Sequence, residues 1–137
     1  MLQFYFLSIF LNAVSGYILF TGAGWDAVSD DEKGFKLSPS NGTFRLVLGI
    51  AAAAVGILKI LSVISGDVPV IGDLIPALAG LLAGFVLIFD YYRRKTTVDS
   101  EKSEKISTLV NANYKWIGIV AMAAAGLHFL FPTVLLL

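Results

Sequence analysis

The chain contains no cysteine and only one histidine, His128. Without cysteine it can form no disulfide, and it offers neither a thiolate ligand for a metal nor a thiol nucleophile. His128 has no second histidine or cysteine with which to complete a metal or haem site. The sequence therefore predicts no metal site and no bound cofactor.

Charge is scarce and balanced. Charged residues make up 15% of the 137 residues, and 10 basic residues offset 10 acidic ones to a formal net charge of zero. A chain without excess positive charge lacks the electrostatic character of a nucleic-acid binder. The sequence also contains no G-x-S-x-G, no H-E-x-x-H and no glycine-rich phosphate-binding motif. We predict that the protein is not an enzyme and does not bind nucleic acid.

Apolar residues are abundant instead, at 57% of the chain, and the mean hydropathy is +0.81. They fall into four runs that are long enough, as helices, to cross about 30 Å of hydrocarbon. The sequence predicts an all-α polytopic membrane protein with one domain, residues 1–137, whose four transmembrane helices form an antiparallel bundle. The expected spans are residues 2–20, 44–65, 70–92 and 114–136.

The distribution of basic residues predicts the orientation. Nine of the ten lie in or beside the loops 21–43 and 93–113, and these are Lys33, Lys36, Arg45, Arg93, Arg94, Lys95, Lys102, Lys105 and Lys115. Loops rich in Lys and Arg stay in the cytoplasm, so both termini are expected outside, and we predict the bacterial cytoplasmic (inner) membrane. The second loop is expected to be a solvated connector or a short interfacial helix with Ile106, Leu109 and Val110 on one face.

Small residues recur at helical spacing along the expected spans. Such stripes let helix backbones approach closely in lipid, where no hydrophobic drive gathers helices. We interpret them as a helix-packing interface that also holds another membrane protein or a second copy of the chain. The glycines assigned to this interface are Gly49, Gly56, Gly80, Gly84 and Gly118.

Two ionisable residues lie inside the expected spans. Lys59 comes 14 residues after Arg45, and His128 comes 13 residues after Lys115. At about 1.5 Å per residue both reach roughly 20 Å above the cytoplasmic boundary, so they should be level with each other. An ionisable residue within a span is a functional hypothesis by default.

Further polar residues are expected near the same height. Ser8 lies on the first span, which runs in the opposite direction, and Asn12 follows it on the same helical stripe. Asp67 and Asp73 lie in the connection between the second and third spans. The candidate polar site therefore consists of Lys59, Asp67, Asp73, His128, Ser8 and Asn12.

Each of these residues also has a purely structural interpretation. Lys59 can extend its stem to the outer headgroups or pair with Asp67. Asp67 and Asp73 each precede a proline closely and fit helix N-caps. His128 fits a packed, hydrogen-bonded side chain.

Two functions follow from this sequence. The first is a small integral membrane subunit or accessory protein that packs against a partner membrane protein or itself in the lipid bilayer. The alternative is a small transporter or solute-binding protein with a polar site around Lys59, Asp73 and His128 that opens to the outer side.

Overall fold

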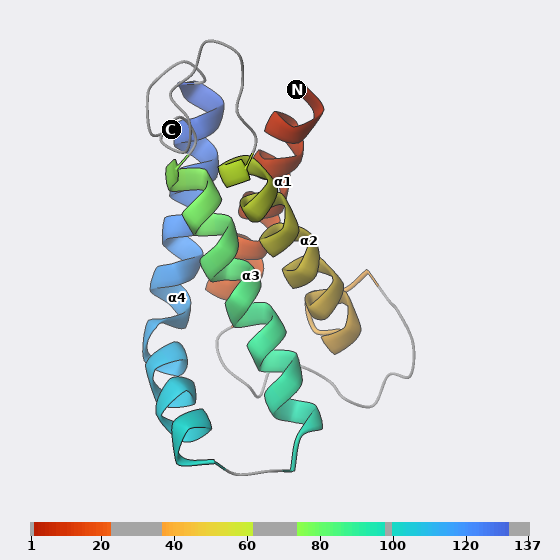
Figure 1. The fold of residues 1–137 in the computed structure, drawn as a ribbon, viewed down its shortest axis with the longest axis vertical. Coiled ribbons are helices and arrows are strands. Elements are labelled where there is room, and N and C mark those ends of the chain that lie inside the picture. Colours follow the sequence, from red (N-terminus) through yellow and green to blue (C-terminus); the bar gives the residue numbers. More distant parts are fainter. Residues whose placement is uncertain (1, 23–36, 62–73, 98–99, 132–137) are drawn as a thin grey trace.

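Four helices make up the structure, a computed structural model that describes residues 2–22, 37–61, 74–97 and 100–131. They are α1 (Leu2–Thr21), α2 (Gly42–Leu61), α3 (Leu74–Lys95) and α4 (Glu101–Leu130). Successive helices run in opposite directions, so that α1 begins and α4 ends at the same end of the bundle (Figure 1). The all-helical prediction is confirmed.

Three of these helices are long and apolar enough to cross a membrane: Gln3–Thr21, Gly42–Leu61 and Leu74–Lys95. They correspond to the first three expected spans. Over the residues that the structure describes, α4 is not among them, because even the apolar second half of the helix includes polar residues such as Asn113, Lys115 and His128. Crossing by α4 stays a prediction, as does the orientation of the two termini.

The ends of the helices have local causes. Asn41 caps α2, since its side-chain oxygen accepts a hydrogen bond of 2.9 Å from the backbone N–H of Phe44. Pro76 lies in the first turn of α3, where its missing N–H leaves no helical bond unmade. At the other end of α3, Arg93, Arg94 and Lys95 lie beside the negative end of the helix dipole.

α4 begins much earlier than expected, at Glu101 instead of near Tyr114. Ser107 and Val110 continue the buried face of Tyr114 toward the start of the helix, whereas Ile106 and Leu109 are exposed. Ser103 also accepts a hydrogen bond of 3.3 Å from Arg93 of α3. The segment 101–113 is therefore part of a long helix and not a connector or a short helix of its own, and of its three apolar residues Val110 is buried while Ile106 and Leu109 are exposed.

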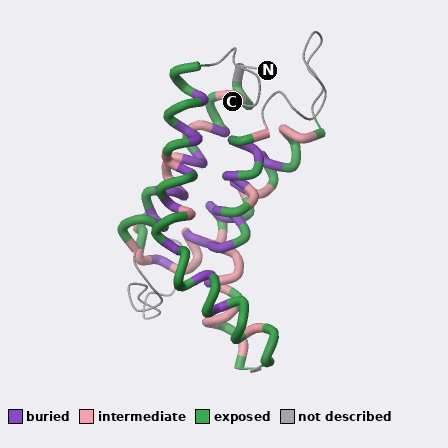
Figure 2. The backbone as a smooth tube through the Cα atoms, turned by 90° about the vertical axis from the view of Figure 1, so that its left-hand side faces the viewer, coloured by how far each residue is buried: buried purple, intermediate pink, exposed green. Residues whose placement is uncertain are grey.

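Close packing joins the helices in two antiparallel pairs, α2 with α3 and α1 with α4, while α1 also packs against α2 and α3. Exposed residues lie on the outer sides of the helices and buried ones between them (Figure 2). A Cβ atom on Gly84 would lie 2.7 Å from the Gly49 carbonyl oxygen, and one on Gly118 would lie 2.7 Å from that of Gly16. Contacts this short require glycine on both seams.

The five glycines of the expected interface all lie between helices of the chain itself. Besides the two seams just described, a Cβ atom on Gly56 would meet the Ala77 carbonyl oxygen at 2.9 Å, and one on Gly80 would meet Oδ1 of Asn12 at 2.9 Å. The stripes thus hold this bundle together, and a partner would have to bind on another surface.

Candidate functional site

Lys59 of α2 and His128 of α4 meet at the end of the bundle where α1 begins. The Lys59 Nζ atom lies 2.7 Å from Nε2 of His128, whose residue is 1% exposed. A charged ammonium only donates hydrogen bonds, so Nε2 accepts and the imidazole carries its proton on Nδ1. The Lys59 head group therefore lies against a buried ring, and this contact does not fit the interpretation that Lys59 only reaches for the headgroups.

Tyr5 of α1 completes this group of side chains. Its hydroxyl donates a 2.6 Å hydrogen bond to the backbone carbonyl of His128, and the two ring centroids are 4.6 Å apart. The Lys59 Nζ atom lies 5.9 Å from the centre of the Tyr5 ring, within the range of a cation–π interaction. We call Tyr5, Lys59 and His128 the lysine–histidine layer.

Polar residues of α1 lie deeper in the bundle. Asn12 is buried and donates a 2.8 Å hydrogen bond to the backbone carbonyl of Pro76 in α3. Gly80 leaves the space for this amide. Ser8 is buried on the same helix, one turn closer to Tyr5. Asn12 thus joins α1 to α3 and has a structural role of its own.

Asp67 and Asp73 lie outside the described residues, as does the whole connection 62–73 between α2 and α3. Of the six residues predicted for the polar site, the structure joins Lys59 and His128 directly and buries Ser8 and Asn12 beneath them.

A second polar layer crosses the opposite end of the bundle. The Arg45 side chain of α2, 1% exposed, donates a 3.0 Å hydrogen bond to Asp90 of α3, and Arg94 contacts the same carboxylate at 3.2 Å. Arg45 also points at the carbonyl of Gly22, 3.5 Å away, and its Cζ lies 6.0 Å from the Tyr114 ring centre of α4. We call Gly22, Arg45, Asp90, Arg94 and Tyr114 the arginine layer.

Sequence reasoning missed most of the arginine layer. Asp90 lies four residues before Arg94, a spacing typical of an ion pair within one helix, and the two side chains are in contact. Arg45 was expected as a residue of the membrane boundary, but it is buried and ties the layer together. The signal that could have found it is the antiparallel pairing of α2 with α3, which brings the start of one helix beside the end of the other.

Both layers connect α2 with α4, which lie at opposite corners of the bundle and hardly touch otherwise. Lys59 reaches His128 at one end, and Arg45 reaches the Tyr114 ring at the other. Among the described residues the arginine layer still contains two buried polar atoms without a hydrogen-bond partner, Nε of Arg45 and the hydroxyl of Tyr114.

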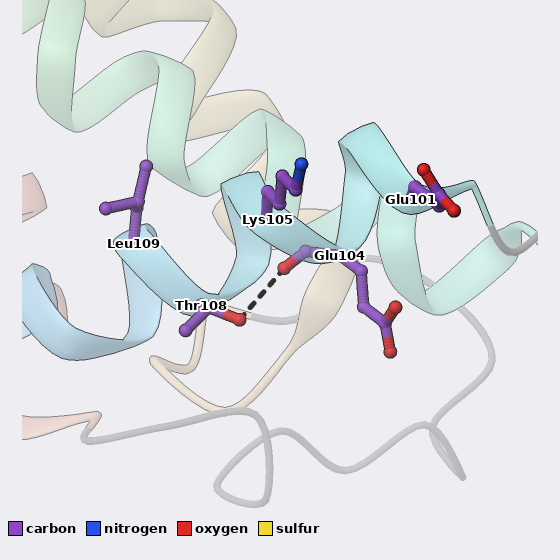
Figure 3. A pocket seen from close by; sticks show the side chains of 5 residues that line it. All are labelled: Glu101, Glu104, Lys105, Thr108 and Leu109. Carbon is purple, nitrogen blue, oxygen red and sulfur yellow. Dashed lines mark hydrogen bonds between the residues drawn. The ribbon is translucent and has the colours of Figure 1, made fainter.

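Two hollows lie on the outside of α4. One, of about 670 Å³, is lined on its described side by Glu101, Glu104, Lys105, Thr108 and Leu109 (Figure 3). Its described lining carries two glutamates and one lysine, so it has no cationic character that would attract an anion. The other, of about 250 Å³, is mainly apolar and lies between α3 and α4. Among the residues that the structure describes, no cluster of His, Asp or Glu is suited to a metal ion.

The fold and the site define the class: a small all-helical bundle with three helices able to span a membrane and a partly buried Lys–His contact at one end. A family model whose description names no function matches residues 1–128. A protein of Treponema pallidum (strain Nichols), described as an uncharacterized protein, is 34% identical over 139 residues, which cover 100% of each chain. The chain belongs to this family. No solved structure matches it.

Proposed function

We propose that this chain is a four-span protein of the bacterial cytoplasmic membrane that binds a small anionic or protonatable solute at the lysine–histidine layer. In this proposal α4 crosses together with α1, α2 and α3, and both termini face outward. The contact between Lys59 and His128 is the observation that carries the proposal.

The contact is informative because an ionisable group in a span is costly unless a neighbour compensates it. A lysine at the centre of a bilayer costs roughly 2.5–3.5 kcal/mol on insertion scales. Lys59 directs its charge to a buried imidazole, so the pair holds one positive charge on two groups that both exchange protons. An anionic solute would be attracted to this charge, and a protonatable one could exchange a proton with His128.

Access from the outside can be tested with single cysteines, because the chain has none of its own. In intact cells, His128→Cys should react with an anionic, membrane-impermeant thiosulfonate faster than with a cationic one, and Lys59→Met should remove the preference. Ala125→Cys, buried about one turn away on α4, is the matched control and should stay unreactive. If the His128→Cys variant does not react either, water does not reach the layer and the solute-binding proposal fails.

The orientation has a separate test. Ser103→Cys lies near the start of α4 on the basic side and should be shielded from an impermeant thiol reagent in intact cells. Val68→Cys, between the second and third spans, should react. Labelling of the Ser103→Cys variant from outside would show that the orientation is the reverse of the one proposed. It would leave the Lys59–His128 contact unaffected.

A subunit role is the second candidate, and the length of α4 favours it. Its 30 residues extend about 45 Å, which exceeds the roughly 30 Å of hydrocarbon. Its polar first turns would then project from the membrane and offer the surface seen in Figure 3 to a partner. This role would be supported by a stoichiometric partner that copurifies with the chain in mild detergent and no longer does so with Leu109→Glu. If no such partner copurifies, the subunit role is excluded.

A further inference from the structure

One face of α4 carries a mostly apolar row of side chains that no other described helix covers. Its members lie alternately three and four residues apart, and all are exposed: Ile106, Leu109, Asn113, Trp116, Val120 and Ala123. The same spacing continues through Leu127 and Leu130. Two helices that pair along their length repeat their contact residues every 3.5 positions, which is the period of this row. We call it the outer seam of α4.

The outer seam is separate from the face that α4 uses inside the bundle. Five buried residues each follow a seam residue directly, and these are Ser107, Val110, Tyr114, Ala121 and Ala124. One position is about 100° around a helix, so the two faces are distinct. An apolar groove of about 250 Å³ lies beside the seam, between Trp116 and Val120 of α4 and Ala79 and Leu82 of α3. α4 can therefore pack in its own bundle and receive the side chains of a second helix.

The seam extends beyond the part of α4 that lipid tails would cover. If the membrane begins near Tyr114, as proposed above, Leu109 lies about 8 Å and Ile106 about 12 Å outside the hydrocarbon. The headgroup region adds only roughly 5–8 Å on each side. Acyl chains do not reach these two exposed residues, whereas a second helix as long as α4 covers both.

Asn113 lies within the seam and requires a polar neighbour. Its Nδ2 atom donates a 2.8 Å hydrogen bond to the backbone carbonyl of Leu109. A side-chain amide has a second N–H and an oxygen acceptor, so it can still bond to another molecule. An acyl chain offers neither donor nor acceptor, whereas an asparagine of a second helix offers both.

The membrane determines how two copies meet. Copies inserted with one topology are related by a two-fold axis along the membrane normal, so their α4 helices run parallel. In a parallel pair each seam residue faces the same residue of the other copy, and Asn113 meets Asn113. One asparagine in such a seam specifies the register and favours two strands.

From this arrangement we infer that two copies of the chain form a parallel dimer through the outer seam of α4, with the groove beside it receiving Trp116 of the second copy. The inference rests on the membrane insertion proposed above, but not on solute binding. It uses no residue of the lysine–histidine layer.

Single cysteines test the dimer in native membranes, because the chain has none of its own. Under oxidation by copper phenanthroline, Ile106→Cys and Leu109→Cys should form disulfide-linked dimers about fivefold faster than Thr108→Cys and Asn111→Cys, since a disulfide needs two Cβ atoms about 4 Å apart. All four positions are exposed and lie within two turns of α4, so they differ mainly in the face that they occupy. Val120→Cys should also cross-link, because the seam continues into the membrane.

The asparagine contact has its own matched pair of variants. Asn113→Ala should lower the dimer association constant in vesicles, measured by energy transfer between labelled copies, by about threefold. Asn111→Ala removes an exposed asparagine from another side of α4 and should leave the constant unchanged.

Three results would overturn the inference: no cross-linked dimer of the Ile106→Cys and Leu109→Cys variants, equal rates on and off the seam, or equal effects of Asn113→Ala and Asn111→Ala. The first is expected if lipid, a different protein or an antiparallel copy covers the seam. Release of the chain from membranes by alkaline carbonate would instead contradict the membrane insertion itself. An unreactive His128→Cys variant would end the solute-binding proposal and leave the dimer standing, so the two failures are distinguishable.

Discussion

The two polar layers of this bundle are built from different chemistry. In the arginine layer a guanidinium meets a carboxylate at 3.0 Å, and a second arginine reaches the same carboxylate. In the lysine–histidine layer the described contacts of the ammonium are to an imidazole nitrogen and an aromatic ring. Arginine stays protonated at every physiological pH, whereas histidine exchanges its proton near neutrality. We therefore expect the first layer to hold the helices together and the second to be available for chemistry.

Asp90→Ala should have the largest effect on stability. It removes the carboxylate from the buried Arg45 and from Arg94, and a stranded buried charge costs about 3–5 kcal/mol. The free energy of unfolding, measured by SDS titration in mixed micelles, would show this loss. Arg45→Met combined with Asp90→Leu should recover much of it, because neither charge is then left buried alone. A loss of about 1 kcal/mol or less for Asp90→Ala would mean that the Arg45–Asp90 pair contributes no more than an exposed salt bridge. The two layers would then not differ in how they stabilise the bundle.

Gly84→Ala tests the seam that connects the two layers. Its Cβ atom would lie 2.7 Å from the Gly49 carbonyl oxygen and 2.8 Å from the Ala53 nitrogen, so α2 and α3 would have to separate. We expect a loss of about 1–3 kcal/mol in the same titration. Gly126→Ala is the control, because nothing lies within 4 Å of its Cβ position, and it should stabilise α4 by up to about 1 kcal/mol. Equal effects at the two positions would show that the helices are not in close contact.

The sequence predicts the helices well where composition decides them and poorly where packing does. Three apolar runs became α1, α2 and α3, because length and hydropathy are enough to identify them. The early start of α4 was missed, since Ser103 and Ser107 resemble a linker, and only the neighbouring α3 shows that they lie on a packed face.

The same distinction applies to the site. The helical rise predicts that Lys59 and His128 are level, but which way each side chain turns depends on the rotation of its helix. Arg45 and Asp90 meet because Gly49 lies opposite Gly84, and each charged residue lies one to two turns from its glycine, toward the same end of the bundle. Hydropathy contains no information about this register, so the pair could not be found from composition.

Tyr5→Phe should have a smaller effect, on the lysine–histidine layer alone. It removes the 2.6 Å hydrogen bond to the His128 carbonyl and keeps the aromatic ring. We expect a loss of about 0.5–1.5 kcal/mol in unfolding free energy. Tyr17→Phe, at an exposed position of α1, is the control and should change little. If both variants behave alike, the Tyr5 hydroxyl does not contribute to holding α4.

Lys59→Met should have the smallest effect on stability, within about 0.5 kcal/mol of zero. It removes one hydrogen bond to His128, but it also removes the free energy required to hold an ammonium away from water, and these two contributions oppose each other. At the described contact the group left behind is a neutral imidazole, whereas Arg45→Met leaves a buried carboxylate without its closest partner. Lys59→Met and Arg45→Met each replace a basic residue by methionine, one at each end of α2, but we expect opposite effects on the stability of the bundle. Lys59→Met should retain the fold and abolish the preference for anionic reagents in the His128→Cys background, and Arg45→Met should destabilise the bundle by about 3–5 kcal/mol. A comparable loss for Lys59→Met would mean that Lys59 stabilises the bundle as Arg45 does, and the assignment of chemistry to its layer would have to be abandoned.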